Sequence, residues 1–379
     1  MVSRRSLLRG ATGLAAAAPL SLAAGEALAA DHTGEALGAG ETLAAEGATV
    51  PETLAVARGQ VGGGTTLTPE VKLSHLSVRA GTDLRVKTAS GWRDVSASGC
   101  TAGSDVATAP GNVLVPAAGV TAYRISSAPT AVTELNTADG RARPRTARPR
   151  TLTLPRAERA PWRPTYLSRA AWGADESYRL NPDGTLISPP AFFGVQTLTV
   201  HHSGEPAPVD DPVQHVRGIY YTHAVSNGWG DIGYQLLIDR YGRVFEGVYS
   251  DPGPIPVFGP GPGAPQMVNG AHVGGFNAGN IGVCVLGNTM ITPPTAAAVR
   301  SLVVVLALLA KATDLDPEGT TGYVNPISGS TATLRTISAH RDWHDANPAA
   351  GATECCGNHL YAQLPAIRTR VAALVDLLG

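Results

Sequence analysis

The sequence has no excess of charge of either sign and no clear internal repeats. Its 29 Lys and Arg residues balance 30 Asp and Glu residues, which leaves a net charge of −1. A chain without a basic excess gives no reason to expect nucleic acid as a partner. The length of 379 residues suggests two domains.

Cysteine is scarce, with only four in the chain. Their spacing is not that of a small disulfide-stapled protein, because Cys100 stands alone in the first half and Cys355 is adjacent to Cys356. Neighbours in sequence are difficult to join to each other. A metal thiolate therefore competes with a disulfide bridge, and the pairing of Cys100, Cys284 and Cys356 stays open. No cysteine lies near the end of the leader segment, which argues against a lipid anchor.

The first 30 residues have the features of a targeting segment that is removed from the mature protein. Residues 3–8, Ser-Arg-Arg-Ser-Leu-Leu, resemble a twin-arginine signal. The apolar run at 11–22 is mostly alanine and is too short and too mild to span a bilayer. Small residues at 27–29 offer a cleavage site, so the mature protein is expected to begin near Ala30. This order of parts favours an export signal over an alanine-rich tail.

Residues 31–128 are predicted to form a small β-rich accessory domain. Alternating runs bounded by Gly, Ser and Asp predict strands at 72–79, 83–87, 92–95, 113–115 and 122–125. Residues 129–165 are rich in Arg and Pro, a composition that cannot form a core. They predict an extended, solvated linker rather than a site for an anionic polymer.

Residues 166–379 change to apolar strands that alternate with helical stretches, the pattern of an α/β domain. Strands are predicted at 196–202, 233–239, 244–246 and 281–287, and helices at 212–226, 295–313 and 360–378. The helix at 295–313 is very apolar. Arg300 and Lys311 bracket a stretch that is short for a membrane span, which favours a buried core helix.

Three separated pieces of this second domain carry residue types that bind metals. In the strand that ends at His201 and His202, alternation puts His201 on the polar face, while His202 is expected to be a packed histidine. His340 and Cys355 lie in loop-like sequence, where functional groups collect. Two neutral imidazoles and one thiolate form a set that leaves a fourth tetrahedral position for water, as in catalytic zinc sites.

Several ordered motifs run from about residue 167 to the end of the chain. They are Ser168-Arg169-Ala170-Ala171-Trp172-Gly173-Ala174, His201-His202-Ser203, Trp229-Gly230-Asp231-Ile232-Gly233-Tyr234, Gly242-Arg243-Val244-Phe245-Glu246-Gly247, Gly270-Ala271-His272 with Asn277, Ile281-Gly282-Val283, and the pieces around His340 and Cys355. Together they resemble the zinc N-acetylmuramoyl-L-alanine amidases, a family shared with peptidoglycan recognition proteins and a phage lysozyme of amidase type. The resemblance implies a mixed central β-sheet flanked by helices.

The same resemblance implies a zinc site and the residues that serve it. It places the zinc ligands at His201, His340 and Cys355. Tyr234 would lie beside the reacting carbonyl, and Thr353 near the water that attacks it. Zinc would polarise the lactyl carbonyl and activate this water.

Two further residues, His272 and Asn277, are candidates for contacts to sugar or peptide, with ordinary surface hydrogen bonding as the alternative. A stiff loop rich in Pro and Gly, between residues 249 and 269, precedes them. This loop is expected to border the substrate groove.

The sequence departs from the family pattern around the last two ligands. Residues 343–352 contain an insertion with His344, which is an alternative ligand. Cys356 stands where proline is usual, so it competes with Cys355 as the thiolate. Cys284 occupies a strand position where some relatives carry a catalytic glutamate, and a role as a small buried hydrophobe is favoured for it.

The function implied by the resemblance is that of an exported peptidoglycan hydrolase, which cleaves the N-acetylmuramoyl-L-alanine amide bond. A secreted or wall-associated monomer without a membrane span is expected, and its first domain would either bind the wall or serve in packing. The alternative is a recognition protein that binds peptidoglycan without cutting it. Relatives that only bind usually lack the cysteine ligand, which favours the enzyme. A glycosidase would need paired acids, and Asp231 with Glu246 offers no clear pair.

Overall fold

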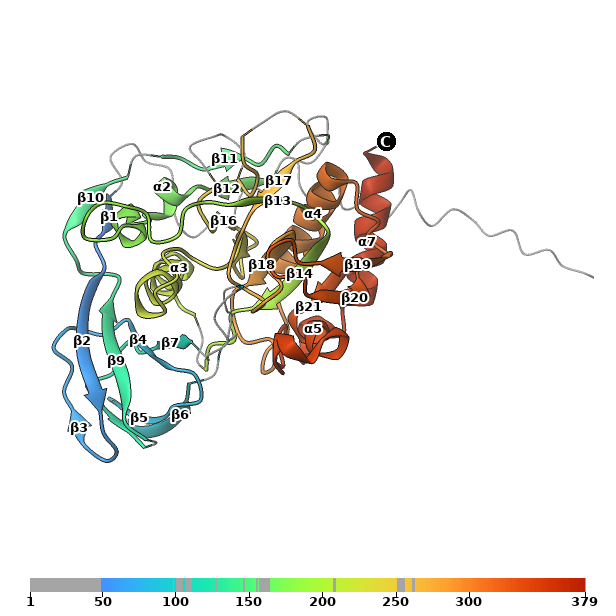
Figure 1. The fold of residues 1–379 in the computed structure, drawn as a ribbon. Helices are drawn as coiled ribbons and strands as arrows, with labels where there is room; N and C mark the ends of the chain where they lie inside the picture. The colour runs from blue at the N-terminus through green and yellow to red at the C-terminus, as the bar shows by residue number, and fades with distance from the viewer. Residues whose placement is uncertain are drawn as a thin grey trace, which may run out of the picture.

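The computed structural model describes residues 49–97, 99, 105, 111–126, 128–145, 147–154, 156, 164–206, 209–250, 256–260 and 263–378. The predicted leader, Cys100 and part of the Arg- and Pro-rich segment lie outside the described residues. Figure 1 shows a β-rich part, built from strands early in the chain, beside a larger part that contains both strands and helices.

Two four-stranded antiparallel sheets form the N-terminal domain, in the orders β2-β9-β4-β7 and β3-β8-β5-β6. The strands are β2 (Leu54–Val61), β3 (Thr66–Leu67), β4 (His75–Arg79), β5 (Asp83–Thr88), β6 (Gly91–Ser96), β7 (Asn112–Pro116), β8 (Ala122–Ile125) and β9 (Thr130–Asn136). Their inward side chains form one hydrophobic core that includes Leu76, Val86 and Tyr123. The structure thus has the β-rich domain that the alternating runs predict.

The sequence pattern missed β2 and β9. Most side chains of β2 are exposed, so this strand has little apolar alternation to reveal it. β9 lies inside the segment that was predicted to be a linker, yet it pairs with both β2 and β4. The N-terminal domain therefore extends to Asn136 instead of ending at residue 128.

A seven-stranded sheet forms the centre of the second domain, in the order β11-β12-β16-β15-β18-β14-β21. Its strands are β11 (Arg150–Thr151), β12 (Thr165–Leu167), β14 (Thr197–His202), β15 (Leu236–Ile238), β16 (Val244–Glu246), β18 (Asn280–Val285) and β21 (Ile337–Ala339). β14 is parallel to β18 and β21, whereas β15 and β16 form an antiparallel hairpin. The prediction of a mixed central sheet is confirmed.

Helices cover both faces of this sheet (Figure 1). α4 (Ala296–Thr313) and α7 (Leu364–Leu377) share a core with Val200 of the sheet. α3 (Pro212–Tyr221) shares the opposite core with Leu237. By length and composition α4 could cross a membrane, but 67% of it is buried. Its packing is that of the predicted core helix.

Shorter elements complete the second domain and its border with the first. β1 pairs with β10, β13 with β17, and β19 with β20. The elements are β1 (Thr49–Pro51), β10 (Ala142–Pro144), α2 (Arg169–Trp172), a turn of helix at Glu176–Arg179, β13 (Phe192–Gly194), a wide helical turn at Thr222–Ser226, β17 (Gln266–Val268), β19 (Thr320–Val324), β20 (Thr331–Arg335), α5 (His340–Ala346), a turn at Pro348–Ala350 and α6 (Asn358–Tyr361).

The Arg- and Pro-rich segment is not a free spacer where the structure describes it. β11 is hydrogen-bonded to β12 at the edge of the seven-stranded sheet. Leu152 and Leu154 are buried in the core of the second domain. Arg143 forms an ion pair with Asp175. The segment has too few apolar residues to form a core of its own. Its isolated leucines are instead buried in the core of the second domain.

The two domains share a hydrophobic core. Leu114 of β7 and Leu135 of β9 belong to the same buried cluster as Val216 and Ile219 of α3. Gly218 lies at the contact, and a β-carbon there would meet Leu114 Cδ2 at 2.7 Å. The missing side chain therefore allows the close approach of strand and helix. This interface favours the packing role of the N-terminal domain over that of a tethered binding module.

A buried hydrogen-bond chain crosses the same interface. His75 Nδ1 lies 2.9 Å from Ser74 Oγ, and His75 Nε2 lies 3.1 Å from His215 Nδ1. The other ring nitrogen of His215 contacts Glu205. Burial, together with the charges of His215 and Arg217, lowers the pKa of His75 well below its ordinary value. His75 is therefore neutral in the folded protein at neutral pH.

We expect the protein to lose stability as the pH falls below about 6.5, the ordinary pKa of histidine in an unfolded chain. In that range the unfolded chain binds a proton at His75 that the folded protein excludes, so protonation favours unfolding. The stabilisation is complete above this pH and is lost below it. Urea unfolding midpoints at about pH 7.5 and about pH 5.5 measure the effect. His75→Gln should narrow the difference between the midpoints, and an unchanged difference would exclude His75 as its source.

Candidate metal centre

His201 stands at the C-terminal end of β14, in the interior of the sheet. β14 pairs with β18 along its whole length and with β21 up to Val200. The ring of His201 faces that of His340, with 4.8 Å between the centroids. His202 points to the opposite face, where its Nδ1 accepts a hydrogen bond from Thr289 N at 3.1 Å. His202 is thus packed as predicted, and His201 is the member of the pair that reaches the cluster.

His340 and Cys355 are held together by the start of α5. Asp342 accepts a hydrogen bond from the backbone at the beginning of the helix, at 2.8 Å. Arg341 N donates to Cys355 O at 2.7 Å, and Cys355 N donates to Thr353 Oγ1 at 3.2 Å. Thr353 thus helps to shape the loop of the cysteine, and its place near an attacking water stays a prediction.

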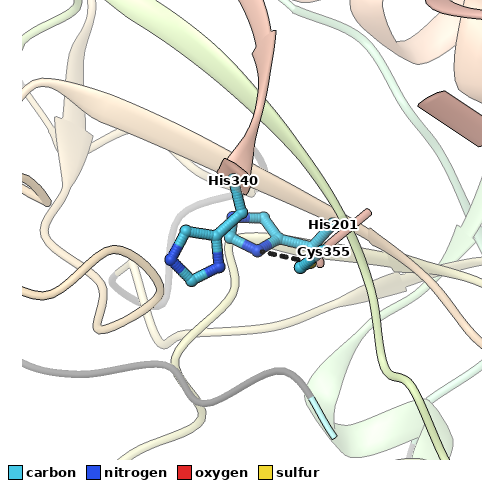
Figure 2. Close-up of side chains that lie close together, drawn as sticks. All are labelled: His201, His340 and Cys355. Atoms are coloured by element: carbon cyan, nitrogen blue, oxygen red, sulfur yellow. Dashed lines mark hydrogen bonds between the residues drawn. The ribbon is translucent and has the colours of Figure 1, made fainter. Parts of the chain in front are cut away.

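The three predicted ligands converge from distant segments of the chain, as Figure 2 shows. One donor atom from each of His201, His340 and Cys355 lies within 4.8 Å of the others. Cys355 Sγ is 3.6 Å from His201 Nδ1. Usual zinc bond lengths at a tetrahedral angle separate sulfur and nitrogen ligands by about 3.6 Å. All three side chains are buried, so the donor set fits a zinc ion.

The alternative ligands lie elsewhere among the described residues. His344, one turn after His340 on α5, is not in the donor cluster. Cys356 packs in the hydrophobic core and is not in the donor cluster. Cys284 is in register with His201 on the neighbouring strand β18, but it is buried among apolar side chains and is not in the donor cluster either. None of the three described cysteines is in a disulfide. These placements favour Cys355 as a thiolate ligand.

Tyr234 borders the cluster just before β15. Its ring centroid lies 5.2 Å from that of His201 and 5.7 Å from that of His223. His223 Nδ1 accepts a hydrogen bond from Gly233 N at 3.0 Å, and its ring lies 4.7 Å from Trp229. Buried aromatic contacts therefore hold a phenol ring next to a candidate metal ligand.

His272 and Asn277 both have fully buried side chains. His272 Nδ1 lies 3.0 Å from His201 Nε2, and its Nε2 lies 2.9 Å from Asn280 O. Asn277 Oδ1 accepts hydrogen bonds from the backbone of His272 and Val273, at 2.7 and 2.8 Å. Their hydrogen bonds are internal to the domain, and contacts to sugar or peptide stay a prediction. The sequence does not show that this loop folds inward beneath a metal ligand.

Asp231 and Glu246 do not form a pair of catalytic acids. Asp231 Oδ1 accepts a hydrogen bond from the buried guanidinium of Arg169 at 2.8 Å, and Glu246 Oε2 accepts one from Arg169 N at 3.0 Å. Burial raises the pKa of both carboxyl groups, and Arg169 opposes the shift. Both acids anchor the first motif of the domain. Asp231 and Glu246 therefore do not supply the acid pair of a glycosidase.

A cavity of about 450 Å³ lies between the segments that lead to Tyr234 and His272. Trp229 lines it from one side. The predicted border loop contributes Tyr249 and Asn269, one from each of its ends. None of His201, Tyr234, His340 and Cys355 lines this cavity. Its use as the substrate groove, and the place of the loop beside that groove, stay predictions.

Comparison with known proteins bears on this site. Residues 192–373 match a family described as N-acetylmuramoyl-L-alanine amidase. The human N-acetylmuramoyl-L-alanine amidase is 32% identical over 143 residues, which are 37% of this chain and 21% of the relative. Human peptidoglycan recognition protein 3 is 29% identical over 139 residues, 36% of this chain and 34% of the relative. The chain thus spans about a fifth of the first relative and a third of the second.

Solved structures of the same kinds also match. Drosophila PGRP-LB is 23% identical with a TM-score of 0.36, and the match covers 52% of this chain and 91% of that one. The N-acetylmuramoyl-L-alanine amidase LysC from Clostridium intestinale is 20% identical with a TM-score of 0.33, over 48% of this chain and 91% of that one.

Proposed function

Because residues 192–373 match the N-acetylmuramoyl-L-alanine amidase family, we propose that the protein is a zinc-dependent amidase of peptidoglycan. It hydrolyses the amide bond between N-acetylmuramic acid and L-alanine. The observation that carries the proposal is the convergence of His201, His340 and Cys355. Three protein ligands leave the fourth tetrahedral position to water and substrate, whereas a structural zinc site would be closed by a fourth side chain.

The chain's own residues prepare the site for this chemistry. Zinc bound by such a set polarises a carbonyl and acidifies water. His201 and His340 bind as neutral imidazoles, and the Cys355 thiolate balances part of the metal charge. Their burial excludes bulk water and strengthens the electrostatic interactions within the site. The Tyr234 hydroxyl donates a hydrogen bond to the carbonyl oxygen as this atom gains negative charge.

Digestion of purified muropeptides by the full-length protein tests the proposal. We expect release of stem peptide with a new L-alanine amino terminus, detected by mass spectrometry. A chelator should stop the release, and added zinc should restore it. Protein that holds one zinc per chain and produces no new amine would refute the amidase activity.

Tyr234→Phe is expected to lower kcat by about 100-fold or more, the usual cost of removing one donor to an oxyanion. Zinc content should not change, because the cluster of donor atoms does not include Tyr234. Tyr323→Phe serves as a control, since it also removes a buried hydroxyl but one that donates to Ala278 O at 2.8 Å. Equal kcat values for Tyr234→Phe and the wild type would remove the tyrosine from the mechanism.

The second candidate function is that of a recognition protein that binds peptidoglycan without hydrolysis. The similarity to human peptidoglycan recognition protein 3 favours it. The retained Cys355 favours the enzyme, because a protein that only binds has no need of a complete catalytic ligand set.

We further propose that the protein is exported through its twin-arginine signal and works as a monomer on the cell wall. Residues 3–8 and the small residues at 27–29 support the export route. The amino terminus of the protein in culture medium should lie near Ala30. An intact leader on protein that stays inside the cell would contradict export.

A further inference from the structure

We propose that His272 is a positioning residue of the metal centre, which fixes His201 in the tautomer that presents Nδ1 to the metal. The inference rests on the proposed zinc function. His272 is outside the donor cluster. Its ring stands at 86° to that of His201, with the centroids 5.0 Å apart. This edge-on arrangement suits a hydrogen bond between the two rings.

The direction of this hydrogen bond follows from a backbone carbonyl. Asn280 O can only accept, so His272 Nε2, which lies 2.9 Å away, carries a proton. In a neutral imidazole the other nitrogen is then an acceptor. His272 Nδ1 therefore accepts a hydrogen bond from His201 Nε2 at 3.0 Å. His201 Nδ1 keeps its lone pair, and this is the atom that faces Cys355 Sγ at 3.6 Å.

Asn280 also links the elements that carry both histidine ligands. Its Oδ1 accepts a hydrogen bond from Thr199 Oγ1 at 2.8 Å, and Thr199 Oγ1 accepts one from Trp343 Nε1 at 2.9 Å. Thr199 precedes His201 on β14, and Trp343 follows His340 on α5. One buried network of hydrogen bonds thus connects β14, which carries His201, with α5, which carries His340, and with the ring of His272.

The fold confines the His272 ring before any metal binds. A β-carbon on Gly282 of β18 would meet atoms of this ring at 2.7 and 2.8 Å, so only glycine leaves room for it. Asn277 Oδ1 accepts a hydrogen bond from His272 N at 2.7 Å, which fixes the backbone at this residue. Partners that orient a ligating histidine in this way raise metal affinity by fixing its tautomer and ring direction.

His272→Phe tests the inference, because it keeps a buried ring and removes both of its hydrogen bonds. We expect its zinc dissociation constant, measured by competition with a chromophoric chelator, to rise by about 10- to 100-fold. His272→Gln can both accept and donate, so it should recover part of the loss. Gly282→Ala, which displaces the ring without removing it, should weaken zinc binding as well.

Tyr323→Phe is the matched control for these variants. It removes a buried hydrogen bond to Ala278 O, in the same loop as His272, at 2.8 Å. Its hydroxyl donates to a backbone carbonyl and Tyr323 is outside the donor cluster, so zinc affinity should equal that of the wild type. An equal loss of affinity in Tyr323→Phe would mean that general loosening of the loop, rather than His272, accounts for the effect.

A tautomer measurement separates positioning from mere structural support. In full-length protein labelled with ¹⁵N-histidine and freed of metal, we expect the His201 proton on Nε2, and both tautomers in His272→Phe. A proton on His201 Nδ1 in the wild type, or unchanged zinc affinity in folded His272→Phe, would overturn the inference. A wild type that binds no zinc would overturn the proposed function instead, while the NMR result would still decide the direction of the hydrogen bond.

Discussion

Cys355→Ser is expected to lose both zinc and turnover. A serine hydroxyl stays protonated at neutral pH, so a neutral oxygen replaces the thiolate that zinc prefers. Changes in residues that only support a ligand weaken metal binding by about 10- to 100-fold, so loss of the ligand itself should exceed about 100-fold. Turnover should fall by at least about 1,000-fold, because the carbonyl loses its electrophile. Metal analysis and mass spectrometry of digested muropeptides measure the two effects.

Cys356→Ala is the matched control for the cysteine variant. Its side chain packs in the apolar core, next in sequence to the ligand but outside the donor cluster. Zinc content and turnover should therefore persist. Turnover, measured beside binding to insoluble peptidoglycan, then separates the two candidate functions. Both predict that Cys355→Ser keeps its affinity for peptidoglycan, but only an amidase has turnover in the wild type that this variant loses. Zinc retained by Cys355→Ser, or lost by Cys356→Ala, would reverse the ligand assignment.

Arg169→Ala is expected to destabilise the protein by about 3–5 kcal/mol, the usual cost of removing one partner from a buried ion pair. The Arg169 guanidinium donates to Asp231 Oδ1 at 2.8 Å, to both carboxylate oxygens of Glu176 at 2.8 and 3.0 Å, and to Gly247 O at 2.6 Å. Without it, Asp231 would keep two backbone hydrogen bonds, from Ile232 N and Tyr249 N, and its ion pair would be the longer one with Arg179, at 3.3 Å. Urea unfolding measures the loss.

Arg335→Ala provides the comparison for a surface arginine. Its side chain is exposed and donates to Glu318 O at 2.7 Å. Its effect should stay within about 0.5 kcal/mol. Arg169→Lys should fall between the two, because an ammonium cannot reproduce the forked contact with Glu176. If Arg169→Ala unfolds at the urea concentration of the wild type, the buried ion pairs are not what fixes this motif.

Strands with regular alternation could be predicted from the sequence, and strands without it could not. β5 and β6 alternate between buried and exposed positions or carry aromatic and β-branched residues, so their bounds were predicted to within about two residues. β2 is mostly exposed, and its place is set by pairing with β9, a partner about 75 residues away. Such long-range pairing leaves no local signal.

The ligand set could be predicted because its residue types bind metals and its motifs resemble those of a known family. Strand alternation put His201 on the polar face, the resemblance implied His201, His340 and Cys355 as ligands, and the structure brings the three together. The role of His272 could not be predicted, since it depends on a backbone carbonyl of Asn280. Every residue has such a carbonyl, so its use as a fixed acceptor is visible only in three dimensions.

The core shared by Leu114, Leu135 and α3 has a consequence for any shortened or recombined form of this protein. A fragment that lacks the N-terminal domain would expose Val216 and Ile219 to water, next to Gly218, which has no side chain to cover them. An exposed apolar surface of this kind promotes self-association. The two halves therefore behave as one cooperative unit, and a chimera with a different accessory module would need matching leucines or a polar redesign of the helix.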